Sequence, residues 1–331
     1  MESIKPDRSN STPPCLAIVM PCYNEEEILP YTLVQVTTFL TNCIQDAIIN
    51  PSSYILCVDD GSSDTTWNII ASTAKNNPHI RGLKLSRNKG HQTALTAGLS
   101  TVIDCDVSVS IDADLQDDLL AIGNMLDAWR NGYDIVYGVR NERKTDTFFK
   151  QKSAEIFYKS MLFMGVDLIP NHADFRLMDR RALDALLKYQ ERNLFLRGLI
   201  PLIGFPSTSV YYARLKRTAG ESKYPLSRMI SLAVQGITSL SVTPLRIIAL
   251  TGLLISIFAL VAIAYALINK EAGRTIPGWT SVTIAIFFMG GIQMLSLGII
   301  GEYIGKIYLE TKRRPLYHVE NTTWKVTSND A

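Results

Sequence analysis

The sequence lacks the two glycine-rich motifs that commonly mark a nucleotide site. Its 331 residues contain neither a G-x-x-x-x-G-K-[ST] segment nor a G-x-G-x-x-G segment. The first absence excludes a P-loop, in which backbone N–H groups and a lysine hold the phosphates, and the second excludes a dinucleotide fingerprint. Any nucleotide that this chain binds must be held in another way, and a metal-assisted diphosphate site is the alternative that remains.

The sequence also has little excess charge of either sign. The 33 Lys and Arg residues and the 31 Asp and Glu residues give a formal net charge of +2 at pH 7. A domain that binds nucleic acid normally carries a strongly basic face. We therefore exclude nucleic acid as a partner.

Cysteine is scarce, and the five cysteines form no recognisable framework. They have no C-x-x-C pair and no histidine at zinc-ligand spacing beside them. Such thiols are typical of reduced core or loop positions in a region that faces the cytosol. The five are Cys15, Cys22, Cys43, Cys57 and Cys105.

Between residues 16 and 139, short apolar runs alternate with helical patterns, which predicts βαβ units and a mostly parallel sheet. Polar loops at residues 21–25, 59–64, 87–91 and 112–116 follow four of these runs. Ligands collect beyond the carboxyl ends of parallel strands, so we expect the four loops to converge at one sheet edge. The predicted strands are Leu16–Met20, Tyr54–Val58, Gly82–Leu85, Val107–Ile111 and Tyr133–Val139.

The loop after the fourth run carries two carboxylates and an amide oxygen, from Asp112, Asp114 and Gln116. Mg²⁺ or Mn²⁺ prefers a few oxygen ligands and keeps open positions for water and phosphate. A D-x-D spacing alone is common in surface loops, so the prediction of a metal site depends on the neighbouring loops. The next two acids, Asp117 and Asp118, are expected to cap the helix that follows.

Two long uncharged stretches near the C-terminus predict transmembrane helices at residues 247–268 and 282–301. At a rise of about 1.5 Å per residue, each is long enough to cross a hydrocarbon core of about 30 Å. Two buried core helices of a soluble domain are the alternative. Residues 224–246 have apolar positions at helical spacing, which predicts an amphipathic helix on the membrane surface. An ordinary surface helix is the alternative there.

Basic residues near the two stretches predict their orientation. Six Lys and Arg residues lie just before the first stretch or just after the second, whereas the intervening loop has two. Basic residues favour the cytoplasmic side, so we expect a multi-pass protein of the inner (plasma) membrane with both termini and the α/β domain cytoplasmic. The predicted layout is a disordered lead without a signal peptide at 1–14, the α/β domain at 15–223, the amphipathic helix at 224–246, membrane helices at 247–268 and 282–301, an extracytoplasmic loop at 269–281 and a cytoplasmic tail at 302–331.

Five short motifs, taken in chain order, resemble those of the family 2 glycosyltransferases of the GT-A fold. They are Pro21–Glu25, Val58–Ser62, Asp112–Gln116, Asp174–Arg176 and Gly220–Tyr224. With the two apolar stretches, they look closest to the branch that makes polyprenyl-phosphate sugars, which includes bactoprenyl-phosphate glucosyltransferases and dolichyl-phosphate mannose synthases. The resemblance spans about residues 16–315 and implies a Rossmann-like α/β GT-A domain, followed by an amphipathic helix and a two-helix transmembrane hairpin.

The resemblance also implies the residues that bind the donor. A carboxylate can accept hydrogen bonds from uracil N3–H or from ribose hydroxyls, and Asp59 with Asp60 match the family's acids in that role. The metal, Mg²⁺ or Mn²⁺, would be held by Asp112, Asp114 and Gln116, with Asp114 also counted as catalytic, and would assist departure of the diphosphate. The full nucleotide-binding set is Pro21, Tyr23, Glu25, Asp59, Asp60, Lys89 and Asp112.

The acceptor implied by the resemblance is a polyprenyl phosphate, whose attack opposite the diphosphate inverts the anomeric carbon. Asp174 matches the residue usually proposed as the base. A phosphate monoester with a second pKa of about 6 is already mostly dianionic at neutral pH, so its deprotonation contributes little. A base, a group that orients Arg176 or fixes a sugar hydroxyl, and a structural partner of Arg176 all stay open for Asp174. The predicted lipid-phosphate residues, some of which could instead anchor to headgroups, are Arg176, Arg197, Arg214, Arg217 and Lys223.

The sequence thus predicts a metal-dependent, inverting transfer of one sugar from a nucleotide sugar to polyprenyl (undecaprenyl) phosphate. Glucose from UDP-glucose is the first choice, and GDP-mannose or an N-acetylhexosamine donor stays open. A processive synthase is disfavoured because the chain lacks a Q-x-x-R-W motif. A catalytically dead nucleotide-sugar-binding protein is disfavoured by the intact acids at positions 112, 114 and 174. The resemblance also implies a homo-oligomer such as a tetramer, in contact with membrane lipids.

Overall fold

The computed structural model describes residues 8, 12–140, 159, 162, 172–213, 236–239, 241–271 and 278–324. These residues fall into two compact units. The first contains the described residues of Met1–Tyr158, Leu168–Pro225 and Arg314–Ala331, and the second contains those of Lys159–Asp167 and Leu226–Arg313.

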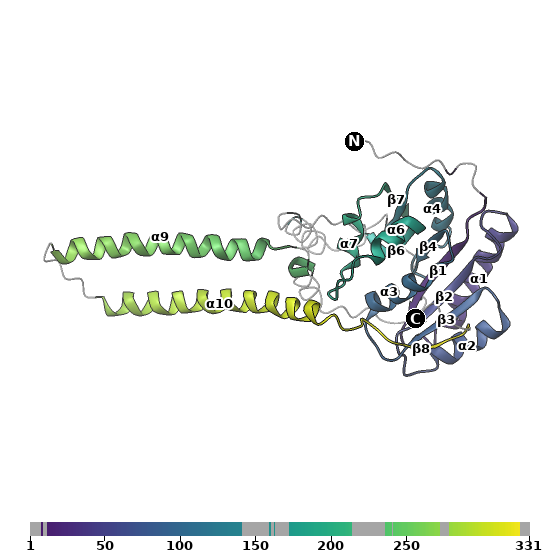
Figure 1. The fold of residues 1–331 in the computed structure, drawn as a ribbon, viewed down its shortest axis with the longest axis horizontal. Coiled ribbons are helices and arrows are strands. Elements are labelled where there is room, and N and C mark those ends of the chain that lie inside the picture. The colour runs from purple at the N-terminus through teal and green to yellow at the C-terminus, as the bar shows by residue number, and fades with distance from the viewer. Residues whose placement is uncertain are drawn as a thin grey trace. The chain divides into compact units, whose positions relative to one another are not determined.

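The first unit is built on a mixed sheet, whose eight described strands have the order β7-β5-β6-β4-β1-β2-β3-β8 (Figure 1). Each of the five predicted strands overlaps an observed one, and their ends differ by at most two residues. The strands are β1 (Leu16–Cys22), β2 (Tyr54–Asp59), β3 (Ile80–Leu85), β4 (Val107–Ser110), β5 (Ile135–Arg140), β6 (His172–Asp179), β7 (Ser207–Tyr212) and β8 (Val319–Thr322).

The expectation of a mostly parallel sheet holds for four of the seven strand pairings among the described residues, namely β1 with β2, β1 with β4, β2 with β3, and β5 with β7. Strand β6 runs antiparallel between β4 and β5, and β8 runs antiparallel to β3. The direction of β6 matters for the site. Its N-terminal end lies at the edge where β4 ends, so Asp174 is brought next to the loop that begins at Asp112.

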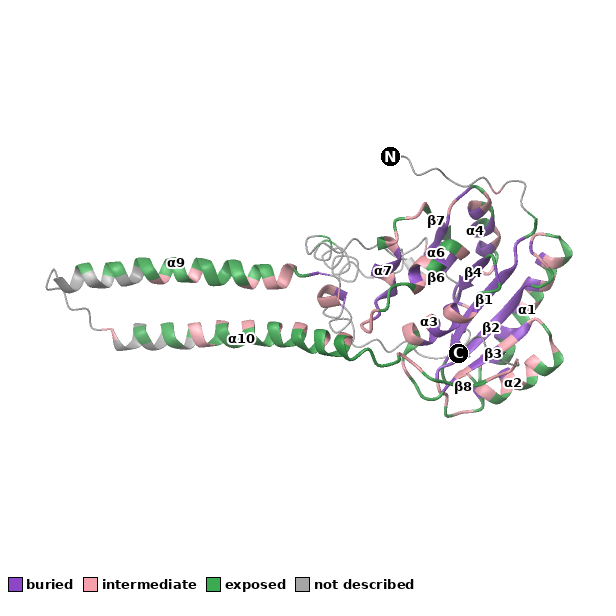
Figure 2. Cartoon of the chain, in the orientation of Figure 1, coloured by how far each residue is buried: buried purple, intermediate pink, exposed green. Residues whose placement is uncertain are grey.

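Helices pack against this sheet through apolar faces. Helix α1 buries Leu29, Leu33, Val36 and Leu40, which recur at helical spacing, and every residue of β1 is buried. A central strand covered on both faces is expected to be apolar throughout, and Figure 2 shows the buried residues gathered along the strands. The helices of this unit are α1 (Leu29–Gln45), α2 (Thr66–Asn76), α3 (His91–Thr101), α4 (Ala121–Arg130), α6 (Arg180–Leu187) and α7 (Leu196–Leu202).

The predicted C-terminal tail contains more structure than its polar composition indicates. Strand β8 pairs with β3, the Thr323 backbone N–H donates to the Gly82 carbonyl at 3.0 Å, and Lys84 Nζ lies 3.0 Å from Glu320 Oε1. The Tyr317 hydroxyl also lies 2.7 Å from Ser100 Oγ. Without β8 the strand β3 would expose a row of unpaired backbone groups, so the tail covers one edge of the sheet.

Arg8 lies within the predicted disordered lead, yet it is anchored on the first unit. Its Nη2 is 2.6 Å from Asp134 Oδ1 and 2.9 Å from Asp179 Oδ2, and its guanidinium lies 5.0 Å from the centre of the Trp129 ring. Two carboxylates with little solvent exposure thus hold the Arg8 guanidinium in place. Residues 1–7 and 9–11 lie outside the described residues.

The second unit contains two long helices, α9 (Thr243–Glu271) and α10 (Trp279–Lys312), which lie side by side (Figure 1). Within the described residues, one helical segment is long and apolar enough to cross a membrane: Thr243–Val261 has a mean hydropathy of 2.2, and none of it is buried. The second predicted span, 282–301, lies within α10 and stays a prediction.

Many residues of both helices are exposed, as the green segments of α9 and α10 in Figure 2 show. Leu250 is 57% exposed, Phe258 is 74% exposed and Met294 is 69% exposed. In water, a helix with apolar residues on all sides would normally be buried in a core. These helices therefore need an apolar partner or an apolar solvent.

The helices of this unit extend beyond the predicted spans. Helix α9 begins before residue 247 and continues to Glu271, and α10 begins at Trp279 and continues to Lys312. Helix therefore includes residues 269–271 and 279–281 of the predicted loop and continues into the predicted tail, because intrahelical hydrogen bonds continue beyond the apolar residues. Of the predicted amphipathic segment 224–246, only residues 236–239, which are helical, and 241–246 are described.

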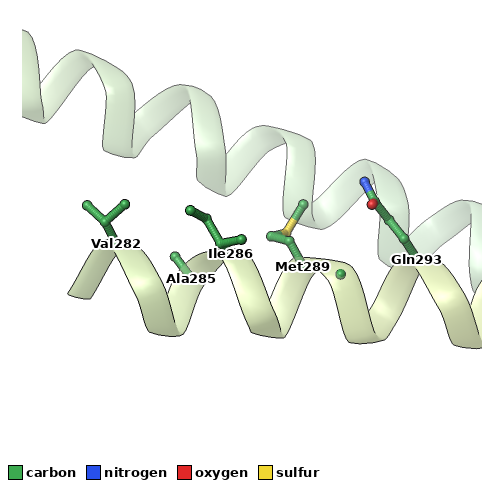
Figure 3. A pocket seen from close by; sticks show the side chains of 6 residues that line it. Val282, Ala285, Ile286, Met289 and Gln293 are labelled. Atoms are coloured by element: carbon green, nitrogen blue, oxygen red, sulfur yellow. The ribbon is translucent and has the colours of Figure 1, made fainter. Parts of the chain in front are cut away.

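A pocket lies along one face of α10, lined by Val282, Ala285, Ile286, Met289, Gly290 and Gln293. In Figure 3 the labelled side chains follow one another along this face and point toward the neighbouring helix. The lining contains no ionisable group, so this pocket has none of the chemistry that a phosphate or a metal ion requires.

Candidate active site

The sheet register brings the predicted site residues to one edge. Cys22 pairs with Asp59 across β1 and β2, Val19 pairs with Ser110 across β1 and β4, and Ser110 pairs with Arg176 across β4 and β6. The carboxyl ends of β1, β2 and β4 therefore lie beside the beginning of β6. This confirms the expected convergence of loops.

The loops after β1 and β2 are joined by hydrogen bonds. The Asn24 backbone N–H donates to Ser62 Oγ at 3.0 Å, Asn24 Oδ1 accepts from the Ser63 N–H at 2.9 Å, and the Glu25 N–H donates to Thr66 Oγ1 at 2.9 Å. Asn24 has a φ of 53°, which asparagine tolerates in tight turns. The three predicted nucleotide residues of this loop differ in access: Pro21 is buried, Glu25 is half-buried and Tyr23 is 46% exposed.

The two acids at the end of β2, Asp59 and Asp60, are both buried, but they have different partners. Asp60 accepts the backbone N–H of Lys89 at Oδ1 (2.7 Å) and that of Gly90 at Oδ2 (2.8 Å). Asp59 Oδ1 accepts the Ser62 N–H at 3.2 Å, and Asp59 Oδ2 is a buried oxygen with no hydrogen-bond partner among the described residues. Burial raises the pKa of both carboxyl groups. Asp60 thus holds the loop after β3, and Asp59 retains an acceptor.

The close approach of the β2 and β3 loops depends on Gly61. It has a φ of +67°, and a Cβ placed there would lie 2.5 Å from the carbonyl carbon of Arg87 and 2.6 Å from the Asn88 nitrogen. Only glycine fits such a position without moving backbone. The Val58–Ser62 motif therefore has a structural reason for its glycine, next to its two acids.

A residue of helix α1 holds the Asp112–Gln116 loop through a hydrogen bond. The buried Thr32 hydroxyl donates to the Ala113 carbonyl at 2.7 Å, Asp114 Oδ1 accepts the Gln116 N–H at 3.3 Å, and Leu115 has a positive φ of 48°. Asp112 and Asp114 are half-buried, whereas Gln116 is 3% exposed. The two carboxylates are therefore open to a ligand, while the amide is covered.

Asp112 stands in an excess of negative charge. Burial is the main reason that the pKa of its carboxyl group is raised to about 6; the nearby carboxylates of Asp117, Asp174 and Asp114 also raise this pKa, whereas His91 lowers it. One unit of pKa corresponds to about 1.4 kcal/mol. A proton or another cation at this carboxylate is therefore favoured.

Asp174 has the opposite environment. Arg176 donates to its Oδ1, while Arg197 donates to Oδ1 through Nε at 3.2 Å and to Oδ2 through Nη2 at 3.1 Å. Burial alone would raise the pKa of Asp174, but the two guanidinium groups outweigh it and lower that pKa well below its usual range. Asp174 is therefore ionised and has its charge balanced by the protein.

His91 lies between these two acids. Its Nε2 is 3.7 Å from Asp112 Oδ1 and 3.6 Å from Asp174 Oδ2. It is the first residue of α3 and follows Gly90, which Asp60 holds. The sequence placed its loop at this edge but did not single out His91, because a single histidine after a strand carries little signal; its position next to two strand-end acids is the feature that identifies it.

Asp117 does not cap the helix as predicted. Its carboxylate is 4% exposed, accepts a hydrogen bond from the Tyr212 hydroxyl, and lies 3.1 Å from Arg140 Nη2. Arg140 Nε also donates to the Tyr212 hydroxyl at 3.1 Å. The cap prediction is wrong because Arg140 and Tyr212, at the ends of β5 and β7, offer stronger partners. Asp118 Oδ1 accepts the Leu120 N–H at 2.9 Å, just before α4 begins.

The predicted lipid-phosphate residues have different positions. Arg176 is 2% exposed and pairs with Asp174, so its surroundings favour positioning over direct contact with a lipid. The Arg197 side chain is 43% exposed and reaches the same carboxylate from helix α7. Arg214, Arg217 and Lys223 lie outside the described residues, and their roles stay predictions.

Comparison with known proteins decides the family. Residues 17–187 match the family described as glycosyl transferase family 2, a segment that contains all but the first residue of β1, the strands β2–β6 and the acids at 59, 60, 112, 114 and 174. The chain belongs to glycosyltransferase family 2. Residues 243–307, which cover most of α9 and α10, match a second family described as the GtrB C-terminal hairpin.

Relatives resemble this family 2 member over nearly its whole length. The uncharacterized glycosyltransferase YkoT of Bacillus subtilis is 50% identical over 308 residues, which cover 93% of this chain and 91% of that protein. The bactoprenol glucosyl transferase of Shigella phage SfX is 36% identical over 92% of this chain and 99% of that protein. A solved mannosyltransferase, PcManGT of Pyrobaculum calidifontis in complex with GDP-Man and Mn²⁺, has a TM-score of 0.46 at 17% identity over 93% of this chain and 87% of that chain, a likeness too distant to carry a functional argument.

The residues of this family 2 site fit a divalent metal ion that keeps some of its water ligands. No group of three His, Cys, Asp or Glu side chains suited to a metal occurs among the described residues. Mg²⁺, however, is usually bound through one or two carboxylates together with water and phosphate. The accessible pair Asp112 and Asp114, with the raised pKa of Asp112, is the donor set that such an ion would use.

Proposed function

We propose that this glycosyltransferase moves one sugar, glucose from UDP-glucose as the first choice, to polyprenyl (undecaprenyl) phosphate with inversion of the anomeric carbon. The observation that carries the proposal is the pair of strand-end acids with opposite charge balance: Asp112 lacks a full complement of cations, and Asp174 has two arginines. A divalent cation at Asp112 would neutralise the charge of a departing nucleoside diphosphate, whereas the neighbouring Asp174 carboxylate is already neutralised by arginines. The similarity to bactoprenol glucosyl transferases supports the lipid acceptor.

The donor would lie over the loops after β1, β2 and β3. Asp59 Oδ2 is the buried acceptor that a nucleoside N–H or ribose hydroxyl would satisfy, since an unpartnered buried oxygen costs about 1–3 kcal/mol. Asp60 would act through the backbone of Lys89 and Gly90, which it already holds. Tyr23, with 46% of its surface exposed, is available to contact the base.

Asp112 and Asp114 would hold Mg²⁺ or Mn²⁺ against the diphosphate. Such an ion supplies Lewis-acid stabilisation of the charge that grows on the leaving group, an effect of several kcal/mol. Gln116, whose side chain is covered, would support the loop through its backbone N–H, which donates to Asp114 Oδ1. GDP-mannose and N-acetylhexosamine donors use the same diphosphate chemistry and are tested below.

Asp174 is poorly suited to act as a general base. A base must take up a proton near the working pH, whereas Arg176 and Arg197 lower the pKa of Asp174 well below its usual range. The acceptor phosphate, with a second pKa of about 6, needs no base at neutral pH. Asp174 would instead orient Arg197, whose exposed guanidinium can contact the phosphate, and stay ionised throughout.

The helical hairpin would place this chemistry at a membrane. Exposed apolar side chains on α9 and α10 and the span-like segment Thr243–Val261 support a multi-pass anchor. The distribution of basic residues supports cytoplasmic termini and a cytoplasmic catalytic unit. A homo-oligomer such as a tetramer is part of the same proposal.

The test offers purified enzyme with labelled UDP-glucose, GDP-mannose and UDP-N-acetylglucosamine, together with undecaprenyl phosphate and Mg²⁺ or Mn²⁺. The readout is label in the lipid phase. We expect transfer from UDP-glucose, loss of transfer in chelator, and loss in Asp112→Asn but not in the control Asp118→Asn, whose Oδ1 accepts the Leu120 N–H.

Transfer from another of the three donors would correct the sugar and keep the reaction. Transfer that persists in chelator would overturn the metal role. Nucleotide binding without transfer from any donor would overturn the enzyme in favour of a nucleotide-sugar-binding protein.

A further inference from the structure

Two cysteines far apart in the sequence lie next to each other at the amino ends of β1 and β4, whereas the candidate active site lies at the carboxyl ends of these strands. Cys15 directly precedes β1, and Cys105 lies two residues before β4. The Cys15 carbonyl accepts the backbone N–H groups of Asp106 at 3.0 Å and Val107 at 3.1 Å, and the Cys15 N–H donates to Asp106 Oδ2 at 2.8 Å. These bonds hold the two chain segments side by side.

The sulfur atoms of this pair are already close. Cys15 Sγ lies 2.8 Å from Cys105 Sγ, and a disulfide has an S–S distance of about 2.05 Å. The sulfurs would therefore approach each other by roughly 0.8 Å. Both residues are buried, with Cys15 9% and Cys105 5% exposed, so the thiols are shielded from large reagents.

One thiol of the pair is activated. The hydrogen bond with Cys105 and a second with Ser52 lower the pKa of Cys15 to about 7, although burial and the nearby Asp104 and Asp106 oppose this. The pKa of Cys105 is raised by its partner and by burial. A pair with one thiolate and one thiol at neutral pH has the arrangement of a nucleophile beside a resolving cysteine.

We propose that Cys15 and Cys105 form a redox modification site, which a small peroxide converts to a reversible disulfide. The Cys15 thiolate attacks one oxygen of hydrogen peroxide, so that an S–O bond forms, the O–O bond breaks and hydroxide leaves to become water. Cys105 then attacks the Cys15 sulfur, which forms the S–S bond and releases the second oxygen as water. Two thiols lose two electrons in total, and one peroxide becomes two waters; a dithiol reductant reverses the change.

The crosslink would join the beginnings of two adjacent central strands, β1 and β4. It would close a long loop, and such a disulfide stabilises a protein mainly by restricting its unfolded state. The active-site loops lie at the other ends of these strands. We therefore expect a higher melting temperature with a transfer rate that changes by less than about twofold.

The experiment treats the purified full chain with hydrogen peroxide and maps its peptides without reduction. We expect a Cys15–Cys105 crosslinked peptide that is about 2 Da lighter than the two reduced peptides combined, together with a melting temperature that rises by several degrees and returns with dithiothreitol. Cys43→Ser is the matched control, because Cys43 is also buried but burial raises its pKa. This variant should form the crosslink, whereas Cys15→Ser and Cys105→Ser should not.

Peptide mapping of the peroxide-treated protein with its native sequence tests the crosslink even if a serine variant fails to fold. Recovery of both cysteines as free thiols after oxidation would overturn the proposal. So would a sulfinic acid on Cys15 without a crosslink, or a crosslink between Cys22 and Cys57, the other neighbouring pair of cysteines.

Discussion

Two acidic regions of one sheet edge differ in how the protein balances their charge. Around Asp174, at the beginning of β6, two arginines form ion pairs with the carboxylate and lower its pKa. Around Asp112, after β4, burial and, to a smaller extent, other carboxylates raise the pKa to about 6 against the effect of His91. His91 Nε2 lies 3.7 Å from one acid and 3.6 Å from the other.

This difference separates a built-in ion pair from a site that needs an outside cation. A carboxylate that the protein already neutralises can position groups but has little attraction left for a metal ion. A carboxylate among like charges binds a proton or a metal ion instead. The division of roles between Asp174 and Asp112 can be tested one side at a time.

The largest effect is expected on the Asp112 side. Asp112→Asn removes one anionic oxygen from the diphosphate site, so the transfer rate should fall by about a thousandfold, which corresponds to roughly 4 kcal/mol of lost transition-state stabilisation. Titration with Mn²⁺ should show weakened binding in the same variant. A variant that keeps both its rate and its Mn²⁺ affinity would place the metal elsewhere.

On the Asp174 side, the main loss is expected in stability. Asp174→Asn leaves Arg176, which is 2% exposed, without its charged partner, and breaking a buried pair from one side costs about 3–5 kcal/mol. Chemical denaturation should measure this loss. The folded pKa of Asp174 is depressed, so its contribution should be present above the unfolded pKa of about 3.9 and decline as pH falls below it. Equal stability of the variant and the native protein would contradict the ion-pair role.

Arg197 tests whether Asp174 acts through an arginine. We expect Arg197→Gln to reduce the transfer rate or acceptor affinity by about 10–100-fold, a range typical when a supporting charged contact is lost. Arg197→Lys should recover part of it, because lysine keeps the charge without the two-point contact. A larger effect on the apparent KM of the nucleotide sugar than on that of the lipid would assign Arg197 to the donor.

The pH dependence should come from Asp112 and not from Asp174. Protons compete with the metal for a carboxylate whose pKa is about 6, so Mn²⁺ affinity should fall by up to about tenfold per pH unit below that value and level off above it. Calorimetric titration between pH 5 and about 8 would measure this. The low-pH decline should be altered in Asp112→Asn, and a decline that disappears only in Asp174→Asn would reverse the comparison.

The smallest effect is expected where a neutral hydroxyl supports the acidic loop. Tyr212→Phe removes the hydroxyl that donates to Asp117 and accepts from Arg140, so the unfolding free energy should fall by about 1 kcal/mol and the rate by a few-fold. Tyr211→Phe is the control, since Tyr211 is the exposed neighbour at 63%. Equal effects of the two changes would show that the Asp117 contact does not matter.

Local sequence was sufficient where a residue's position follows from its own strand. The runs that became β1, β2 and β4 are short and apolar, so their ends could be located, and with them Asp59, Asp60 and Asp112. Local sequence was insufficient where the partner comes from a distant segment. Asp117 is 95 residues from Tyr212, and its preference for that hydroxyl over a helix cap depends on where β7 ends.

The sequence by itself determined the alternation of strands and helices, the acids at the strand ends and the apolar helices, because these depend on the spacing of neighbouring residues. Only the tertiary structure decided the charge of those acids. The antiparallel insertion of β6 brings Asp174 and Arg176 beside Asp112, and helix α7 adds Arg197. The state of a carboxylate depends on burial and on charges within a few ångströms, and those neighbours are distant in the chain.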